Sequence, residues 1–232
     1  GMPQGGPLSP LLSNIMLNEL DKELERRGHR FVRYADDCMI FCKSKKSAER
    51  TLKNIIPFIE RKLFLKVNRR KTEVAYISKV KYLGYTFYRY KGKCRFRVHQ
   101  KSVAKMKNRI RELTNRNKGI SNEIREKKYQ EYVRGWVEYF RLADMKGLLK
   151  TTDEWVRRRI RAVYWKQWKK IKTKYRMLRA LKLEHRKAME LAMSRKKYWR
   201  MSIVLGLVIT NKIIAKLGYI SMLDYYLTVC EN

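Results

Sequence analysis

Two adjacent carboxylates, Asp36 and Asp37, are the side chains in this sequence most suited to chemistry. Strand-forming residues flank them from Phe31 to Phe41, which predicts a short hairpin with both acids at its tip. Neighbouring carboxylates repel each other unless water or a cation lies between them, and a hard divalent ion such as magnesium suits them best. The alternative is that both are ordinary turn residues, because Asp favours turns through local hydrogen bonds.

Other segments of the chain favour the metal hypothesis. Residues 1–12 read GMPQGGPLSPLL, and Tyr34-Ala35 directly precede the two acids. In this order and at about this separation, the two segments resemble two consecutive motifs of reverse transcriptases. Residues 68–72 (NRRKT) and 82–85 (YLGY) resemble the next two motifs of that family. The resemblance implies the lower part of a polymerase palm.

In such a palm, a primer hydroxyl attacks the α-phosphate of a nucleotide, assisted by two magnesium ions about 4 Å apart. The resemblance implies that Asp36 binds both ions and that Asp37 is an auxiliary ligand. It places Tyr34 along the primer end, Gln4 near the incoming nucleotide and the templating base, and Gly84 in the primer grip.

Lys71 resembles the lysine that lies near the triphosphate, where it neutralises charge or acts as a general acid. A solvated surface role is an equal alternative, because the chain has 57 lysines and arginines. Gln4 has the alternative of a simple loop amide, and Gly84 that of a strand bulge.

A third carboxylate and the fingers are expected upstream of the Gly-Met-Pro-Gln-Gly loop, where this sequence has no residues. The resemblance therefore predicts that Gly1 is the edge of a fragment or of a truncated reading frame. We expect the metal site to be incomplete in this chain, and whether the chain alone polymerises is left open.

The elements that must position these residues follow from hydrophobic periodicity and turn signals. Ser9 and Pro10 are suited to begin a helix, as N-cap and first helical residue. Helices are predicted to about residue 26 and from about residue 46 to 63, and strands at residues 74–77, 82–87 and 94–98. The predicted class is α+β: a partial palm over residues 1–98, with an antiparallel sheet and helices on one face.

Long basic helices are predicted after residue 98, one of them from about Ser121 to Tyr139. Residues 132–140 (YVRGWVEYF) resemble the thumb, or maturase-specific domain, of group II intron reverse transcriptases. A capping box formed by Thr151 and Glu154 is expected to begin the next helix. We therefore predict a helical thumb or maturase domain at residues 99–150 and a basic helical RNA- or DNA-binding region at residues 151–232.

The charge of the chain implies a polyanionic partner. It has 57 Lys and Arg against 21 Asp and Glu, a net charge of +36, and its 44% hydrophobic residues describe a folded protein. Basic side chains on the helix that begins near residue 151 and just after it are the candidate nucleic-acid ligands: Arg157, Arg158, Arg159, Arg161, Lys169 and Lys170. The tryptophans among them have core packing as the favoured alternative.

Composition also excludes several classes. No run of 18 or more uncharged apolar residues is present, so a membrane-spanning segment is not expected. Four cysteines without a CxxC pair and only three histidines argue against a zinc site and against an appended HNH endonuclease. The expected setting is the reducing cytoplasm of a bacterium.

These observations predict an RNA-directed DNA polymerase and maturase of a group II intron, a magnesium-dependent nucleotidyltransferase of a mobile element. The expected partners are intron RNA, a DNA target or primer, and deoxynucleotides. One alternative is a non-catalytic RNA-binding maturase that assists splicing. Another is a bacterial reverse transcriptase of the retron or CRISPR-associated type, which the Gly-Trp-Val-Glu-Tyr-Phe stretch at residues 135–140 disfavours.

Overall fold

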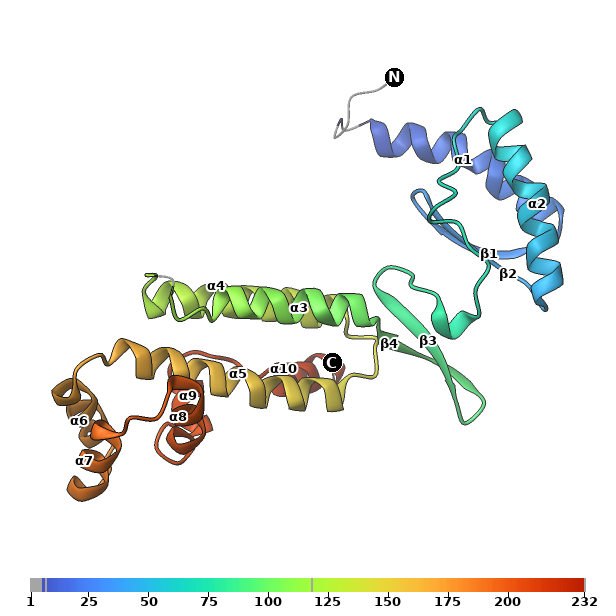
Figure 1. Ribbon diagram of the computed structural model, residues 1–232. Helices are drawn as coiled ribbons and strands as arrows, with labels where there is room; N and C mark the ends of the chain where they lie inside the picture. The colour runs from blue at the N-terminus through green and yellow to red at the C-terminus, as the bar shows by residue number, and fades with distance from the viewer. Residues whose placement is uncertain (1–5, 7, 118, 232) are drawn as a thin grey trace. The chain divides into compact units, whose positions relative to one another are not determined.

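The computed structural model describes residue 6, residues 8–117 and residues 119–231 (Figure 1). Gln4, a predicted nucleotide contact, lies outside the described residues. The chain divides into two compact units, Gly1–Tyr88 and Arg89–Asn232. The first unit mixes helices and strands and the second is mainly helical, which confirms the predicted α+β class. The finer division at residues 98 and 150 stays a prediction.

The first unit begins with a helix, a hairpin and a second helix. These are α1 (Ser9–Arg26), β1 (Arg30–Tyr34), β2 (Asp37–Phe41) and α2 (Lys45–Arg61). Leu8, not the predicted Ser9, is the N-cap residue of α1, and Pro10 lies in the first turn, where its missing N–H costs nothing. Ser44 caps α2 by accepting a hydrogen bond from the backbone N–H of Ser47 (3.2 Å).

A small core joins the hairpin to both helices. Its buried residues are Leu20, Leu24, Ile55 and Leu63. Phe31 and Ile40 are a cross-strand pair, and both pack against this core, so they define the inner face of the hairpin. Burial of this face holds β1 and β2 against α1 and α2.

The predicted strand at residues 74–77 is wrong. Residues 72–76 are irregular, and a short 3₁₀ helix, η1 (Ile77–Lys79), follows them. A strand needs a hydrogen-bonding neighbour, and no strand among the described residues pairs with this segment. The sheet signal belongs instead to β3 (Tyr85–Tyr90) and β4 (Lys93–Val98), which form a second two-stranded sheet; the boundary between the units falls within β3.

The second unit is built around one long helix, α5 (Lys146–Gln167), which packs against α8, α9 and α10. The other elements are α3 (Gln100–Leu113), α4 (Asn122–Tyr139), α6 (Ile171–Ala180), α7 (His185–Met193), α8 (Tyr198–Val204), η2 (Leu205–Leu207), α9 (Asn211–Lys216) and α10 (Met222–Glu231). The predicted helix from about Ser121 to Tyr139 is confirmed as α4, and Ser121 is its N-cap residue. Among the described residues, no helix is both long enough and apolar enough to cross a membrane.

The predicted capping box at Thr151 and Glu154 is wrong, because α5 begins earlier, at Lys146. The hydroxyl of Thr151 donates to the backbone oxygen of Leu148 (3.0 Å), inside the helix. A capping box stabilises a helix start because the first backbone N–H groups of a helix lack partners. Within α5 these N–H groups already bond to carbonyl oxygens of the preceding turn, so the pattern has no capping role there.

Candidate functional site

The hairpin carries its two carboxylates as the sequence predicts. Tyr34 pairs with Asp37 across the strands, so Ala35 and Asp36 form a two-residue loop. Ala35 has a φ of 53°, which a tight hairpin loop requires of its first residue. Tyr34 and Asp37 share the face of the hairpin opposite Arg33, because successive side chains alternate along a strand.

Arg33 ties the tip of the hairpin to α1. Its Nε donates to Asp21 Oδ1 at 2.8 Å and its Nη2 to Asp21 Oδ2 at 2.5 Å. Its Nη1 donates to Asn14 Oδ1 at 3.0 Å and to the backbone oxygen of Ala35 at 2.9 Å. The hydrogen bonds with Asp21 raise the pKa of Arg33 above its ordinary value. One guanidinium therefore holds both the helix and the loop that contains Asp36.

Sequence reasoning missed this anchor. The only local signal is that Asn14 and Asp21 lie two helical turns apart, on one face of α1. Nothing in the sequence connects that face to Arg33, because the contact depends on how the hairpin folds back over α1.

Asp36 and Asp37 remain available to a ligand. Both residues are exposed, and neither carboxylate forms a hydrogen bond or ion pair with any residue that the structure describes. Adjacent carboxylate oxygens fit a hard divalent cation such as Mg²⁺. The described part of the chain holds no group of three or more His, Cys, Asp or Glu side chains able to bind a metal. Metal binding by Asp36 and Asp37 stays a prediction.

The remaining predicted residues of the first unit lie on other segments. Lys71 is exposed in the loop after α2, and its backbone N–H donates to the oxygen of Asn68 at 3.0 Å. Leu83 and Gly84 form a two-residue turn, so Gly84 does not lie in the predicted strand. The φ of Leu83 is 49° and that of Gly84 is 82°, and glycine adopts such positive values without strain.

Tyr82 directly precedes that turn. Burial raises the pKa of Tyr82, and the nearby Cys38 and Asp37 raise it further, so its ring lies within electrostatic range of the hairpin tip. The structure therefore brings Tyr34, Asp36 and Asp37 together and places the turn with Gly84 near them.

The arginines predicted to bind nucleic acid have different environments in the second unit. Arg161 is buried, and its Nε donates to the backbone oxygen of Ile209 (2.9 Å). The Nε of Arg159 donates to Thr114 Oγ1 (2.6 Å), and Arg158 lies 4.1 Å from the centre of the Trp199 ring. These guanidiniums hold α5 to its neighbours, while each side chain except that of Arg161 keeps some exposure.

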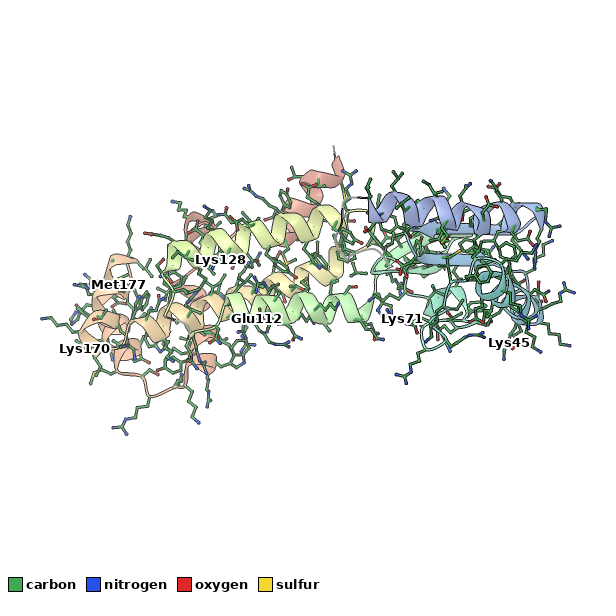
Figure 2. All side chains as sticks on the ribbon, turned by 90° about the horizontal axis from the view of Figure 1, so that it is seen from above. Lys45, Lys71, Glu112, Lys128, Lys170 and Met177 are labelled. Carbon is green, nitrogen blue, oxygen red and sulfur yellow. The ribbon has the colours of Figure 1, made fainter. Side chains whose placement is uncertain are left out.

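Lys169 and Lys170 lie just after α5 and are exposed. Long side chains with nitrogen at the tip project from the helices of this unit, and Figure 2 labels Lys128 and Lys170 among them. Trp136, Trp165 and Trp168 are buried, so core packing holds for these three. Of the described tryptophans, only Trp155 and Trp199 keep substantial exposure.

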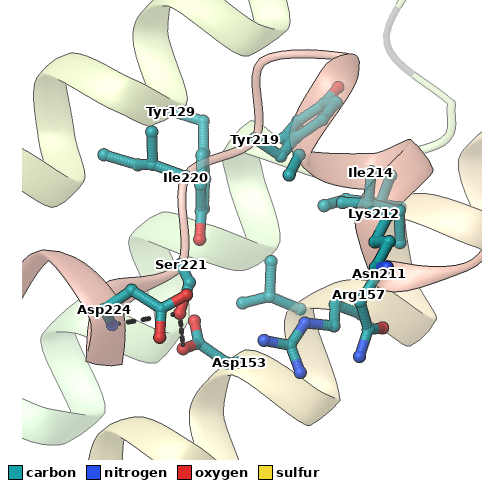
Figure 3. Close-up of a pocket in the computed structure, with 13 residues that line it drawn as sticks. Tyr129, Asp153, Arg157, Asn211, Lys212, Ile214, Tyr219, Ile220, Ser221 and Asp224 are labelled. Atoms are coloured by element: carbon teal, nitrogen blue, oxygen red, sulfur yellow. Dashed lines mark hydrogen bonds between the residues drawn. The ribbon is translucent and has the colours of Figure 1, made fainter.

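A pocket of about 250 Å³ beside α5 shows how this unit uses a carboxylate (Figure 3). Asp153 is 3% exposed and accepts hydrogen bonds from the hydroxyl of Ser221 (2.7 Å) and the backbone N–H groups of Met222 (2.9 Å) and Leu223 (3.0 Å). These are N–H groups at the start of α10, so Asp153 caps a neighbouring helix. Arg157 and Lys212 also line the pocket.

Comparison with known proteins matches each unit to a family. Residues 1–87 match the family described as reverse transcriptase (RNA-dependent DNA polymerase), and residues 103–199 match the group II intron maturase-specific domain. A polymerase palm followed by this domain defines an intron-encoded protein.

The chain belongs to the group II intron reverse transcriptases and maturases. It is also 30% identical to the protein YkfC of Escherichia coli (strain K12), in a match that covers 34% of this chain. The match spans 29% of that relative's length.

Proposed function

We propose that this chain provides the metal-binding palm hairpin and the RNA-binding helices of a group II intron protein. That protein would copy RNA into DNA and bind its intron RNA during splicing and mobility. The observation that carries the proposal is the pair of exposed carboxylates on an anchored hairpin, followed in the same chain by a maturase-specific domain.

Asp36 and Asp37 would hold the magnesium ions, which supply charge neutralisation to phosphoryl transfer. The chain's own residues prepare that site. Arg33 ties the loop that contains Asp36 to α1, so the loop loses little conformational entropy when a ligand binds. Tyr34 is 63% exposed beside Asp37, where its ring can pack along a primer end.

Lys71 is exposed and, in this proposal, offers its ammonium to the triphosphate of the nucleotide. Gln4 and Gly84 keep their proposed places near the templating base and the primer. Intron RNA, a DNA primer or target, and deoxynucleotides are the proposed partners, in the bacterial cytoplasm. The palm at residues 1–98, the thumb or maturase domain at 99–150 and the basic region at 151–232 are the proposed domains.

Primer extension on an RNA template tests the polymerase part. It is measured with a polypeptide that joins this chain to the fingers and the upstream palm strand of a reverse transcriptase. Asp36→Asn removes a charge but little volume, and we expect synthesis to fall by about a thousandfold or more, since charge stabilisation supplies most of such a barrier. Binding of intron RNA should stay within about twofold.

Glu25→Gln is the matched control, because Glu25 is an exposed carboxylate on α1, outside the hairpin. It should leave synthesis unchanged. Near wild-type synthesis by Asp36→Asn would contradict the metal assignment. RNA binding without synthesis by the unsubstituted polypeptide would favour the non-catalytic maturase instead.

A second readout needs no turnover. Fe²⁺ can replace Mg²⁺ at oxygen ligands, and added hydrogen peroxide oxidises it to Fe³⁺ with release of hydroxide and a hydroxyl radical that cuts nearby backbone. We expect cleavage of the chain around residues 34–38 in the presence of template, primer and nucleotide, and its loss in the Asp36→Asn variant.

A further inference from the structure

A second candidate site lies in the helical unit, away from the pocket at Asp153. It is a cavity of about 560 Å³ between the end of α3, the loop that follows it, α5 and α8. This volume falls within the range of about 300–1,000 Å³ that is typical of small-ligand sites. Three arginines and two tryptophans line it: Arg111, Arg116, Arg159, Trp155 and Trp199.

The cavity carries uncompensated positive charge. Burial lowers the pKa of Arg159, and the charges of the nearby Arg111 and Arg116 lower it further. Glu112 is the one carboxylate among the lining residues, and it pairs with Arg109 at 2.8 Å. Like charges held together around a cavity favour an anionic ligand, and arginine forks fit phosphate oxygens well.

The tryptophans add a second kind of contact. Arg111 and Arg159 lie 5.5 Å and 5.2 Å from the centre of the Trp155 ring, so this ring is occupied in holding the arginines. Trp199 differs. Arg158 lies 4.1 Å from its ring centre, yet the residue is 41% exposed.

The Nε of Arg158 is buried, and its guanidinium covers one face of the Trp199 ring. The Trp199 indole therefore contacts one guanidinium and keeps enough exposed surface for a second planar group to stack on it. Nucleic-acid bases stack on aromatic side chains whatever their sequence. An open indole beside unneutralised arginines matches the two chemical parts of a nucleotide, a base and a phosphate.

We propose that this cavity binds one unpaired nucleotide of a nucleic-acid strand, with its base on Trp199 and its phosphate between Arg111 and Arg116. The inference rests on the proposed function, because it concerns the RNA-binding part of the same chain, and it names the feature that this part recognises. Base-paired nucleotides cannot reach the indole, since their bases are stacked within the helix.

Binding of the chain to matched hairpin oligonucleotides tests this. One oligonucleotide has a single bulged adenosine, and its partner has an abasic residue at the bulge; both are made as RNA and as DNA. The unsubstituted chain should bind the bulged adenosine about tenfold tighter than the abasic partner. Preference within the RNA pair alone assigns an RNA strand, preference within the DNA pair alone a DNA strand, and preference within both a strand of either kind.

Three variants separate the contacts. Trp199→Ala should bring the adenosine-to-abasic ratio to about one while leaving the salt dependence unchanged, and Trp199→Phe should restore the ratio to within about threefold. The double variant Arg111→Gln with Arg116→Gln should weaken binding to both oligonucleotides and reduce the salt slope by about 0.7, since one phosphate contact is lost and single strands release about 0.7 counterions per contact.

Lys127→Gln with Lys128→Gln is the matched charge control, because both lysines are exposed on α4 and neither lines the cavity. It should leave the adenosine-to-abasic ratio intact. A ratio of about one in the unsubstituted chain, or a full ratio in Trp199→Ala, would overturn the inference. Neither result depends on DNA synthesis, so failure of the polymerase proposal is distinguishable from failure here.

Discussion

The two units of this chain use aspartate in opposite ways. In the first unit, Asp36 and Asp37 are exposed at a hairpin tip and have no partner among the described residues. In the second, Asp153 is 3% exposed and accepts three hydrogen bonds at the start of α10. Partners decide which role a carboxylate has: one that is already satisfied stabilises the fold, whereas an unsatisfied pair is open to a cation.

The arginines divide in the same way. Arg33 and Arg161 donate to groups inside their own units and hold elements together. Arg111 and Arg116 border a cavity in which positive charge exceeds negative. The net charge of +36 therefore overestimates how many basic side chains are available to bind a polyanion, because some of the arginines hold structural elements together.

The largest expected effect in folding is at Asp153. Asp153→Ala leaves two backbone N–H groups and a hydroxyl without their acceptor, and we expect it to lower the free energy of unfolding by about 3 kcal/mol. Asp36→Ala should change it by less than about 0.5 kcal/mol, because that carboxylate has no partner in the described chain. Urea denaturation followed by circular dichroism measures both. Equal losses would end the contrast between the two aspartates.

A smaller effect is expected at the hairpin anchor. Arg33→Ala should destabilise the first unit by about 2 kcal/mol, since it breaks charged, partly buried hydrogen bonds to Asp21. Arg33→Lys keeps the charge but loses the planar fork, so it should recover less than half of the loss.

A double-mutant cycle with Asp21→Asn isolates the pair. A coupling energy near zero would show that Arg33 does not hold the hairpin through Asp21. The same variants should reduce Fe²⁺-dependent cleavage at residues 34–38 if the anchor positions the metal ligands.

Local signals in the sequence predicted the hairpin well. Alternating strand residues around Asp36 and Asp37 need only two residues to turn, and the observed pairing of Tyr34 with Asp37 follows. Contacts between distant segments were not predictable in this way. The bonds from Arg33 to α1, and the burial of Arg161 against Ile209, depend on packing between elements that no periodicity reveals.

The failures have the same cause. Residues 74–77 have strand propensity but no partner strand among the described residues, and Thr151 with Glu154 matches a capping box in the middle of a continuous helix. Propensity is a weak prior that tertiary context overrides. The nucleotide cavity was missed because its residues come from α3, α5 and α8, far apart in the chain.

Smaller effects than at the hairpin anchor are expected at two glycines, one in each unit, and should have opposite signs. Gly84 has a φ of 82° in its turn, so Gly84→Ala should cost about 1 kcal/mol. Gly135 lies within α4, and a methyl group added there would meet no atom within 4 Å, so Gly135→Ala should stabilise by about 0.5–1 kcal/mol. Thermal unfolding of each variant measures the shifts. Destabilisation by Gly135→Ala would contradict the open space around residue 135 and show that the fold of α4 itself requires the glycine.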